Sequence, residues 1–255
     1  MLKKVGIIGA SGRLGNEIGN LIASSNKYQL GLSYNRSNSE NISIDDVFLD
    51  NDYIIDASSS SILSNVLRSA LNNPKPLLIL TTGWQESEFQ QILNSLSNLA
   101  CVIIASNTSY GAYMQGALAY DIAKNLGQEY DIDIVEQHHR NKLDQPSGTA
   151  LNLFNIIAKS KQENQNLNYT LYDHKHNSQP RSPLTISIES RRSGNIPGEH
   201  EIYFTSSDEI ISVKHVALNR SLFAHGAIKI LDWLLLNEPK SGIYYSSDIF
   251  KIEVT

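Results

Sequence analysis

The segment EQHHRNKLDQPSGTA, residues 136–150, brings together side chains that could transfer a proton and bind an anion. A histidine has an unperturbed pKa of about 6.5, so the adjacent His138 and His139 can each hold or give a proton near neutral pH. Lys142 follows closely enough to neutralise a carboxylate or to help donate that proton. Residues 147–149, Ser-Gly-Thr, then offer hydroxyls and open N–H groups at an expected helix start, which is a site suited to anions.

Two interpretations of this segment stay open on the residues alone. One is a solvated polar turn followed by an ordinary helix cap. The other is a pocket in which the carboxylates of an acidic substrate dock at the helix start and at Lys142, while a histidine acts as general acid. Beside a nicotinamide, the matching chemistry is hydride addition to a C=C or C=N bond together with proton delivery. Arg140 adds positive potential but has no assigned role.

A second segment, GASGRLG at residues 9–15, has the composition of a phosphate-binding loop. Gly9, Gly12 and Gly15 form a G-x-x-G-x-x-G pattern between an apolar, strand-like run and an amphipathic, helix-like run. Glycine lets the backbone turn tightly and approach a pyrophosphate, which then meets the N–H groups of the helix. A purely structural turn is the alternative, but the strand–loop–helix context favours dinucleotide binding.

The segment SYNRSN, residues 33–38, bears on which cofactor binds. At the end of a second strand a carboxylate holds the ribose 2′-OH of NAD, whereas an arginine accommodates the 2′-phosphate of NADP. Asn35 stands where the acid would be, and Arg36 follows it. The pair favours NADPH, and NADH stays open because Arg36 could equally be a surface residue.

Composition limits the class of protein. The chain has 255 residues, 41% of them hydrophobic and 18% charged, which suits one large domain or two modest ones. The net charge of -5 and the lack of a basic stripe argue against a nucleic-acid binder. No apolar run approaches the roughly 20 residues of a membrane span, and MLKKVGIIGASG reaches glycine too early for a signal peptide, so we expect a cytoplasmic protein. Cys101 is the single cysteine, which excludes an intrachain disulfide.

The order of apolar runs predicts two kinds of sheet. Up to about residue 106, short apolar runs alternate with amphipathic ones, which indicates a parallel sheet covered on both faces. The middle third instead shows polar–apolar alternation in YDIDIVE, LTISIES, EHEIYFTS and EIISVKHVA, as in a mixed or antiparallel sheet with one free face. Helices are expected over 110–127, from 150 to about 159, and over 221–237, the last returning to the first sheet. Residues 160–183 lack periodicity and are predicted to form a long exposed loop.

The motif at residues 136–150 resembles the signature E-x-H-H-x-x-K-x-D-x-P-S-G-T-A of the dihydrodipicolinate reductases, the 4-hydroxy-tetrahydrodipicolinate reductases of lysine and diaminopimelate biosynthesis. Further similar pieces are GASGRLG, TTG at 81–83, SN at 106–107, RSGNIPGEH at 192–200 and NRSLFAHGAI at 219–228. The resemblance thus covers essentially the whole chain. It implies NAD(P)H-dependent reduction of 4-hydroxy-tetrahydrodipicolinate, a small dicarboxylate, by a homotetramer.

The resemblance also implies roles and domains. The catalytic pair would be His138 as proton donor and Lys142 as its partner. The substrate would be held by His139, Ser147, Gly148 and Thr149. The cofactor would be held by Gly9, Ala10, Ser11, Gly12, Arg13, Leu14, Asn35, Arg36, Thr81, Thr82, Ala105, Ser106, Asn107 and Thr108. The implied α/β fold has a Rossmann-like parallel-sheet dinucleotide domain, residues 1–107 with 217–255, and a central α+β mixed-sheet domain for substrate binding and oligomerisation, residues 108–216.

Several positions depart from the family pattern. Asn35 replaces the usual acid, Leu80 the usual glycine before TTG, Thr108 a frequent aromatic residue, and Ala57 the usual phenylalanine. These departures concern cofactor preference and rate, because the catalytic positions all match. Arg191, Arg192, Glu199 and His200 are expected to form structural ion pairs at the pocket rim. His174, His176, His215 and His225 lack a ligand pattern, so we expect no metal site.

Two rival functions are weighed against this one. A non-catalytic NADP(H)-sensing protein would use the same glycine loop but leave the histidine–lysine motif without a function. A different dehydrogenase, such as one acting on an amino-acid semialdehyde, would need its own substrate signature, which the chain does not display.

Overall fold

The computed structural model describes residues 2–172 and 180–250. The chain forms two compact units, which we call the first unit (Met1–Ser109 with Arg220–Thr255) and the second unit (Tyr110–Asn219). Among the described residues, no helix combines the length and apolar character needed to cross a membrane.

The first unit is built on a six-stranded sheet in the order β11-β5-β4-β3-β1-β2, and every neighbouring pair is parallel. Its strands are β1 (Lys3–Ile8), β2 (Tyr28–Leu30), β3 (Tyr53–Asp56), β4 (Leu77–Ile79), β5 (Cys101–Ile104) and β11 (Gly242–Tyr245). The chain leaves β1 for β2 on one side and returns to β3 on the other. Ligands of open parallel sheets bind at such a switch point, outside the carboxyl ends of the strands.

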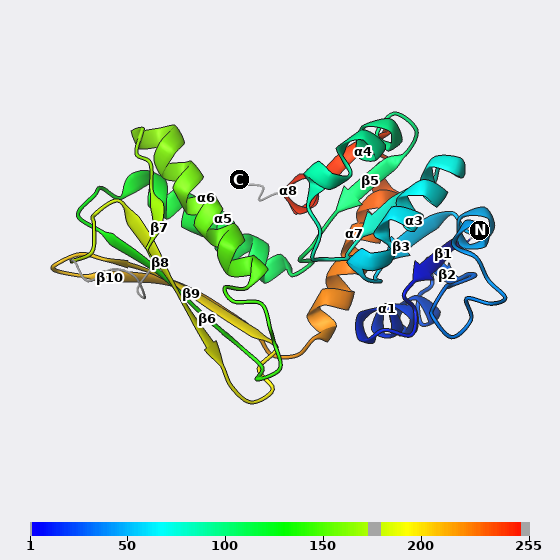
Figure 1. Ribbon diagram of the computed structural model, residues 1–255, viewed down its shortest axis with the longest axis horizontal. Coiled ribbons are helices and arrows are strands. Elements are labelled where there is room, and N and C mark those ends of the chain that lie inside the picture. The colour runs from blue at the N-terminus through cyan, green and yellow to red at the C-terminus, as the bar shows by residue number, and fades with distance from the viewer. Residues whose placement is uncertain (1, 173–179, 251–255) are drawn as a thin grey trace. The chain divides into compact units, whose positions relative to one another are not determined.

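Helices cover both faces of this sheet, as the apolar runs predict. They are α1 (Arg13–Ala23), α2 (Ile44–Asp50), α3 (Ser60–Asn72), α4 (Gln90–Leu96), α7 (Ser221–Asn237) and α8 (Ser246–Ile249), with a 3₁₀ turn at Glu86–Glu88. The helices α1 and α7 pack together on one face, while α2, α3 and α4 enclose a separate apolar cluster on the other (Figure 1). All four residues of β3 are buried, which explains why its sequence is apolar without alternation.

The second unit has a five-stranded mixed sheet in the order β10-β9-β6-β8-β7. Its strands are β6 (Asp131–His138), β7 (Thr170–Tyr172), β8 (Thr185–Arg192), β9 (Gly198–Thr205) and β10 (Ile210–Ala217). The strand β6 is central: it runs antiparallel to β9 and parallel to β8. Two helices, α5 (Tyr110–Asn125) and α6 (Gly148–Gln165), lie side by side against one face (Figure 1).

The alternation along β6 decides what faces the helices. Ile132 and Ile134 are fully buried against the helices, and Asp131 and Asp133 point to the opposite face. Each buried isoleucine contributes about 1.5–3 kcal/mol to folding. The next two inward positions are Glu136 and His138, so the apolar core gives way to ionisable side chains at the end of the strand.

The predicted loop over residues 160–183 is wrong in its first part. Helix α6 continues to Gln165, and β7 pairs in parallel with β8 inside the predicted loop. The helix is extended by contacts with α5 and with the residue after it, which the sequence does not display: Ser160 Oγ donates to the Tyr120 carbonyl at 2.7 Å, and Lys161 Nζ donates to the Leu126 carbonyl at 2.5 Å. Residues 173–179, with His174 and His176, lie outside the described residues.

Candidate active site

Two ionisable residues at the end of β6 form the centre of the site. Glu136 and His138 are two positions apart, so the strand pleat directs both side chains to the same face. The carboxyl Oε2 of Glu136 lies 2.5 Å from Nδ1 of His138. Glu136 is fully buried and His138 is 7% exposed. A buried carboxyl is costly unless it is paired, so this contact holds both groups in place.

Arg192, at the end of the neighbouring strand β8, secures the other side of Glu136. Its Nη2 donates to Oε1 at 2.8 Å, and its Nη1 donates to Oε2 at 3.0 Å. Burial acts to raise the pKa of Glu136, but the hydrogen bonds from His138 and Arg192 outweigh it and lower the pKa to about 2. The carboxylate is therefore ionised at neutral pH.

His200 stands opposite Glu136 on β9, and its ring meets the ring of His138 edge to face with centroids 5.1 Å apart. Burial, followed by the charge of His138, lowers the pKa of His200 to about 3. Its Nε2 lies 3.1 Å from Oγ of Ser147. Gln115, on α5, fixes the strand behind it by donating to the His200 carbonyl at 2.7 Å. His200 is thus a neutral, buried partner of the helix start and forms no ion pair with a described residue, contrary to the expectation.

Glu136, His138 and His200 each offer a ligand atom, and these atoms lie within 4.8 Å of one another. The arrangement is better suited to hydrogen bonding than to a metal ion. The guanidinium of Arg192 covers both carboxylate oxygens, and its positive charge opposes a cation there.

Helix α6 begins beside this cluster. Ser147 is its N-cap, and Ser147 Oγ accepts from the Ala150 N–H at 3.2 Å. Gly148 is exposed, a side chain there would meet nothing within 4 Å, and the first turn carries no acidic residue. The helix start therefore offers positive potential and open space to an anion. Thr149 is half-buried in the same turn.

The loop between β6 and α6 carries Lys142, whose Nζ lies 2.7 Å from Oδ1 of Asp144. Arg192 also reaches this loop, because its Nη2 donates to the Asp144 carbonyl at 2.6 Å. The structure thus brings Lys142, the helix start and the buried pair into one unit, with His139 half-buried in the same loop. The Arg140 N–H donates to the Gly194 carbonyl at 3.1 Å, so the backbone of Arg140 joins the loop to the β8–β9 turn.

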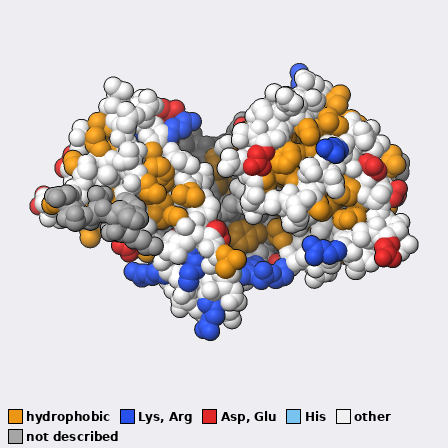
Figure 2. All heavy atoms as spheres, viewed as in Figure 1, with side chains coloured by type: hydrophobic (Ala, Val, Ile, Leu, Met, Phe, Trp, Pro, Cys, Tyr) orange, Lys and Arg blue, Asp and Glu red, His pale blue; other side chains and the backbone are white. Residues whose placement is uncertain are grey.

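Basic residues gather at this end of the second unit. Figure 2 shows Lys and Arg side chains at the tip where β6 and β8 finish, the part of the chain that contains Arg140, Lys142, Arg191 and Arg192. A net negative protein thus presents local positive charge at one strand end. Glu199 is paired instead with Lys214 at 2.5 Å, as a structural ion pair.

The glycine loop of the first unit fits a dinucleotide diphosphate. Gly9 has a φ of +90°, and a side chain there would come 2.5 Å from the Ala57 carbonyl oxygen. Gly12 is the N-cap of α1 and has no side chain to cap it. The N–H groups of Arg13 and Leu14 are thereby left without an acceptor among the residues that the structure describes. Bare backbone and free N–H groups together form a cradle for phosphate.

The residues after β2 form a tight turn. The side-chain Oδ1 of Asn35 accepts from the N–H groups of Ser37 and Asn38 at 2.9 and 3.1 Å, and from Ser37 Oγ at 2.5 Å. This oxygen is therefore already used within the turn. Arg36 is exposed beside it and makes no ion pair with any described residue.

The other predicted cofactor residues lie at the same carboxyl edge of the first sheet. Thr81 is buried and its Oγ1 accepts from the Ser58 N–H at 3.1 Å, whereas Thr82 is exposed. Ala105 and Thr108 are buried, and Thr108 Oγ1 donates to the Phe223 carbonyl of α7 at 2.6 Å. The threonine that replaces the usual aromatic residue thus anchors α7. Ser106 is exposed and Asn107 is half-buried between them.

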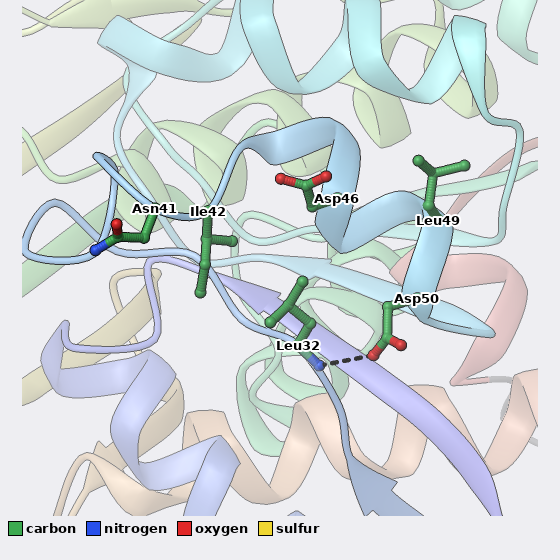
Figure 3. A pocket seen from close by; sticks show the side chains of 6 residues that line it. All are labelled: Leu32, Asn41, Ile42, Asp46, Leu49 and Asp50. Carbon is green, nitrogen blue, oxygen red and sulfur yellow. Dashed lines mark hydrogen bonds between the residues drawn. The ribbon is translucent and has the colours of Figure 1, made fainter.

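A hollow of about 580 Å³ on the first unit lies outside this edge. Its lining side chains come from the loop before α2 and from α2 itself: Leu32, Asn41, Ile42, Asp46, Leu49 and Asp50 (Figure 3). None of them is basic. Asp50 accepts from the Leu32 N–H at 3.2 Å, and Asp46 belongs to the cap of α2, so both carboxylates have structural roles.

Glu136 and His200 were not singled out for the catalytic cluster from the sequence. The alternation of β6 carried a usable signal, because Glu136 and His138 occupy inward positions that should be apolar. No comparable signal placed His200, since its approach to His138 depends on the pairing of β6 with β9. Asp56, at the end of β3, is also fully buried; its Oδ1 accepts from the Ser58 N–H at 3.2 Å, and burial raises its pKa.

Comparison with known proteins shows the family of the chain. Residues 3–108 match the family description "Dihydrodipicolinate reductase, N-terminus", and residues 111–250 match "Dihydrodipicolinate reductase, C-terminus". The 4-hydroxy-tetrahydrodipicolinate reductase of Chlamydia abortus is 40% identical over 242 residues, covering 94% of this chain and 96% of that protein. The enzyme of the same name from Rickettsia rickettsii is 37% identical over 248 residues, covering 97% and 99%.

Solved structures share the fold. The dipicolinate-bound dihydrodipicolinate reductase of Paenisporosarcina sp. TG-14 has a TM-score of 0.74 at 21% identity, covering 96% of this chain and 98% of that one. At 21% identity this likeness carries the fold alone, and it agrees with a Rossmann-like parallel sheet joined to a mixed sheet. The family descriptions and the relatives matched over nearly the whole chain show more than the fold: the chain belongs to the dihydrodipicolinate reductase family.

Proposed function

We propose that this protein reduces 4-hydroxy-tetrahydrodipicolinate to tetrahydrodipicolinate with a reduced nicotinamide dinucleotide. In the balanced reaction, the substrate, NAD(P)H and one proton give tetrahydrodipicolinate, NAD(P)⁺ and water. The observation that carries the proposal is the buried Glu136–His138 pair beside the open start of α6, in a chain whose match to a relative in the family covers 94% of its residues.

The second unit supplies the substrate site. The substrate is a dianion, and the start of α6 at Gly148 and Thr149 combines helix-dipole potential with free space. Lys142 contributes a mobile ammonium that exchanges Asp144 for a substrate carboxylate, and His139 lies in the same loop. Ser147 acts through the cap of α6 and through His200, since its hydroxyl is engaged with both.

His138 is the proton donor in this proposal. The ring is nearly buried and is held by an ionised carboxylate, which stabilises the imidazolium that must exist before the proton leaves. Lys142 assists by neutralising the charge of the substrate next to the donor. His200 is excluded from this role because its low pKa keeps it neutral.

The first unit supplies the cofactor site. When bound, the nicotinamide supplies the hydride. The diphosphate is held by Gly9 to Leu14, and the edge residues Thr81, Thr82 and Ala105 to Thr108 line the path of the nucleotide. NADPH is the preferred cofactor, because Oδ1 of Asn35 is used in its own turn and cannot also accept from a ribose 2′-OH, whereas Arg36 is exposed to meet a 2′-phosphate.

An absorbance assay of nicotinamide oxidation tests the function, with the substrate made in situ by condensing aspartate semialdehyde and pyruvate on the preceding synthase. Consumption of NADPH that depends on both the synthase and this protein supports the proposal. Binding of NADPH without turnover would instead identify the rival, a redox-sensing protein.

We also propose that the protein is a homotetramer joined through the free face of the second sheet. That face carries exposed apolar residues on β10, with Ile210 64% and Val216 41% exposed. Light scattering should give four times the 28.3 kDa of one chain. A monomer mass would overturn this assembly. We propose further that the reaction takes place in the cytoplasm, where reduced nicotinamide nucleotides are regenerated.

A further inference from the structure

The hydrogen bond at Nδ1 of His138 determines where the transferable proton sits. Glu136 is ionised, so its Oε2, 2.5 Å from Nδ1, can only accept a hydrogen bond. The Nδ1 atom must therefore carry hydrogen. A neutral His138 then has no proton on Nε2, and a charged His138 carries its second proton there.

The orientation of Glu136 is itself fixed from outside the pair. Both of its oxygens accept from Arg192, at 2.8 and 3.0 Å, and the fork of a guanidinium matches a carboxylate in one plane. The strand pleat sets the spacing from Glu136 to His138. The ring of His138 is consequently held in one orientation, with Nδ1 toward Glu136.

Gly198, which has no side chain, leaves space beside the opposite edge of the His138 ring. A Cβ placed on Gly198, the first residue of β9, would lie 3.1 Å from Nε2 and 3.4 Å from Cδ2 of His138. A side chain at position 198 would therefore crowd the atom that faces away from Glu136. The neighbouring His200 does not compete, because its Nε2 is engaged with Ser147.

We propose that Glu136 is a positioning residue that keeps hydrogen on Nδ1 of His138, so that Nε2 is the atom that delivers the proton to the substrate. This inference rests on the proposed function. In the transfer, the N–H bond at Nε2 breaks, a C–H bond forms on the substrate ring, and the electron pair of the broken bond stays on the imidazole. Glu136 keeps its charge throughout.

Nitrogen NMR of ¹⁵N-histidine-labelled protein tests the tautomer directly, with the His138 signals assigned by their loss in His138→Gln. In the wild type, neutral His138 should show a protonated Nδ1 and an unprotonated Nε2. In Glu136→Gln, the amide can accept from or donate to Nδ1, so both tautomers should appear. Wild-type His138 protonated on Nε2 would overturn the proposal, and this result does not depend on whether Glu136→Gln folds.

Kinetics supply the second readout. Glu136→Gln should lower kcat by at least about 10-fold and up to the 10⁴-fold that follows loss of an orienting carboxylate elsewhere, while KM and NADPH affinity stay near wild type. Gly198→Ala should also lower kcat but keep the Nδ1 tautomer. Glu163→Gln is the matched control, because Glu163 lies exposed on α6 and a glutamine still accepts from Tyr120.

The outcomes separate the two proposals. A folded Glu136→Gln protein with wild-type kcat and a single Nδ1 tautomer would contradict the positioning role. Absence of turnover in the wild type would refute the proposed function, whereas the wild-type NMR spectrum tests the inference whether or not the protein turns over.

Discussion

His138 and His200 show how two histidines in edge-to-face contact acquire different properties. His138 faces the ionised Glu136, so its charged form has a partner. His200 faces a hydroxyl and is more deeply enclosed, so burial keeps it neutral with a pKa of about 3. The two rings therefore divide the work, with one carrying the proton and the other supporting the helix start.

Replacing His138 by glutamine tests the proton donor. The variant should lose about 10²- to 10⁴-fold in kcat, the range that general acids contribute, because glutamine cannot supply a proton. NADPH affinity, measured by fluorescence titration, should stay unchanged since the cofactor residues belong to the other unit. Near-normal turnover in this variant would show that another group protonates the substrate.

Arg36 tests the choice of cofactor. Arg36→Ala should weaken NADPH binding by about 1.5–3 kcal/mol, the usual value of a hydrogen bond to a charged group, and leave NADH binding nearly unchanged. Parallel titrations with both cofactors measure the difference. Equal loss for both, or for neither, would contradict a 2′-phosphate contact at Arg36.

At the scale of elements, α6 converts local backbone geometry into an anion site. Its N-cap Ser147 joins three features: the Ala150 N–H, the ring of His200 and the loop that carries Lys142. The capping hydroxyl thereby fixes where the helix begins relative to the donor.

Ser147→Ala should lower the free energy of unfolding by about 0.5–2 kcal/mol through loss of the cap, and should also raise KM for the substrate. Urea unfolding and steady-state kinetics measure the two effects. Ser43→Ala is the matched control, because Ser43 caps α2 in the first unit by accepting from Asp46. It should lose similar stability with unchanged KM; a KM shift in both variants would point to a general effect of destabilisation.

Elements with a strong local pattern were predictable, and those that depend on partners were not. The strand–glycine–helix start, the parallel alternation and the mixed sheet follow from periodicity alone. The last turns of α6 do not, because Ser160 and Lys161 look like surface residues until α5 and the residue after it supply acceptors for them. The strands β7 and β11 were also missed, because they are defined by pairing with β8 and β5 and not by a local pattern.

The same limit applies within the site. His138, Lys142 and the start of α6 lie close together in the sequence, so the motif revealed them. Arg192 and His200 reach Glu136 only through pairing of β6 with β8 and β9, which no local pattern encodes.

For the whole molecule, the buried ionisable groups predict that the free energy of unfolding falls at low pH. His200 has a pKa of about 3 in the folded protein, below its ordinary value of 6.5. Its contribution to the free energy of unfolding is therefore complete above pH 6.5 and is lost as the pH falls toward 3. The pKa of Glu136 is lowered from 4.5 to about 2, so the free energy of unfolding falls further below pH 4.5.

Unfolding free energy should therefore drop by roughly 2 kcal/mol from His200 alone between about pH 7 and about pH 5. Urea unfolding at the two pH values measures the drop. In His200→Gln the drop should shrink by that amount, since the titrating group is gone. An unchanged drop would mean that His200 is not held neutral in the folded protein.

The most direct test of the whole account follows the transferred atoms. The substrate is generated in situ, and NADPH carries deuterium at the position of the nicotinamide from which hydride is transferred. Mass spectrometry then measures the mass of the product. The wild type should yield tetrahydrodipicolinate that carries the deuterium, and His138→Gln should bind the cofactor yet form this product far more slowly. Unlabelled product, or no product at all from the wild type, would contradict the reduction assigned to this chain.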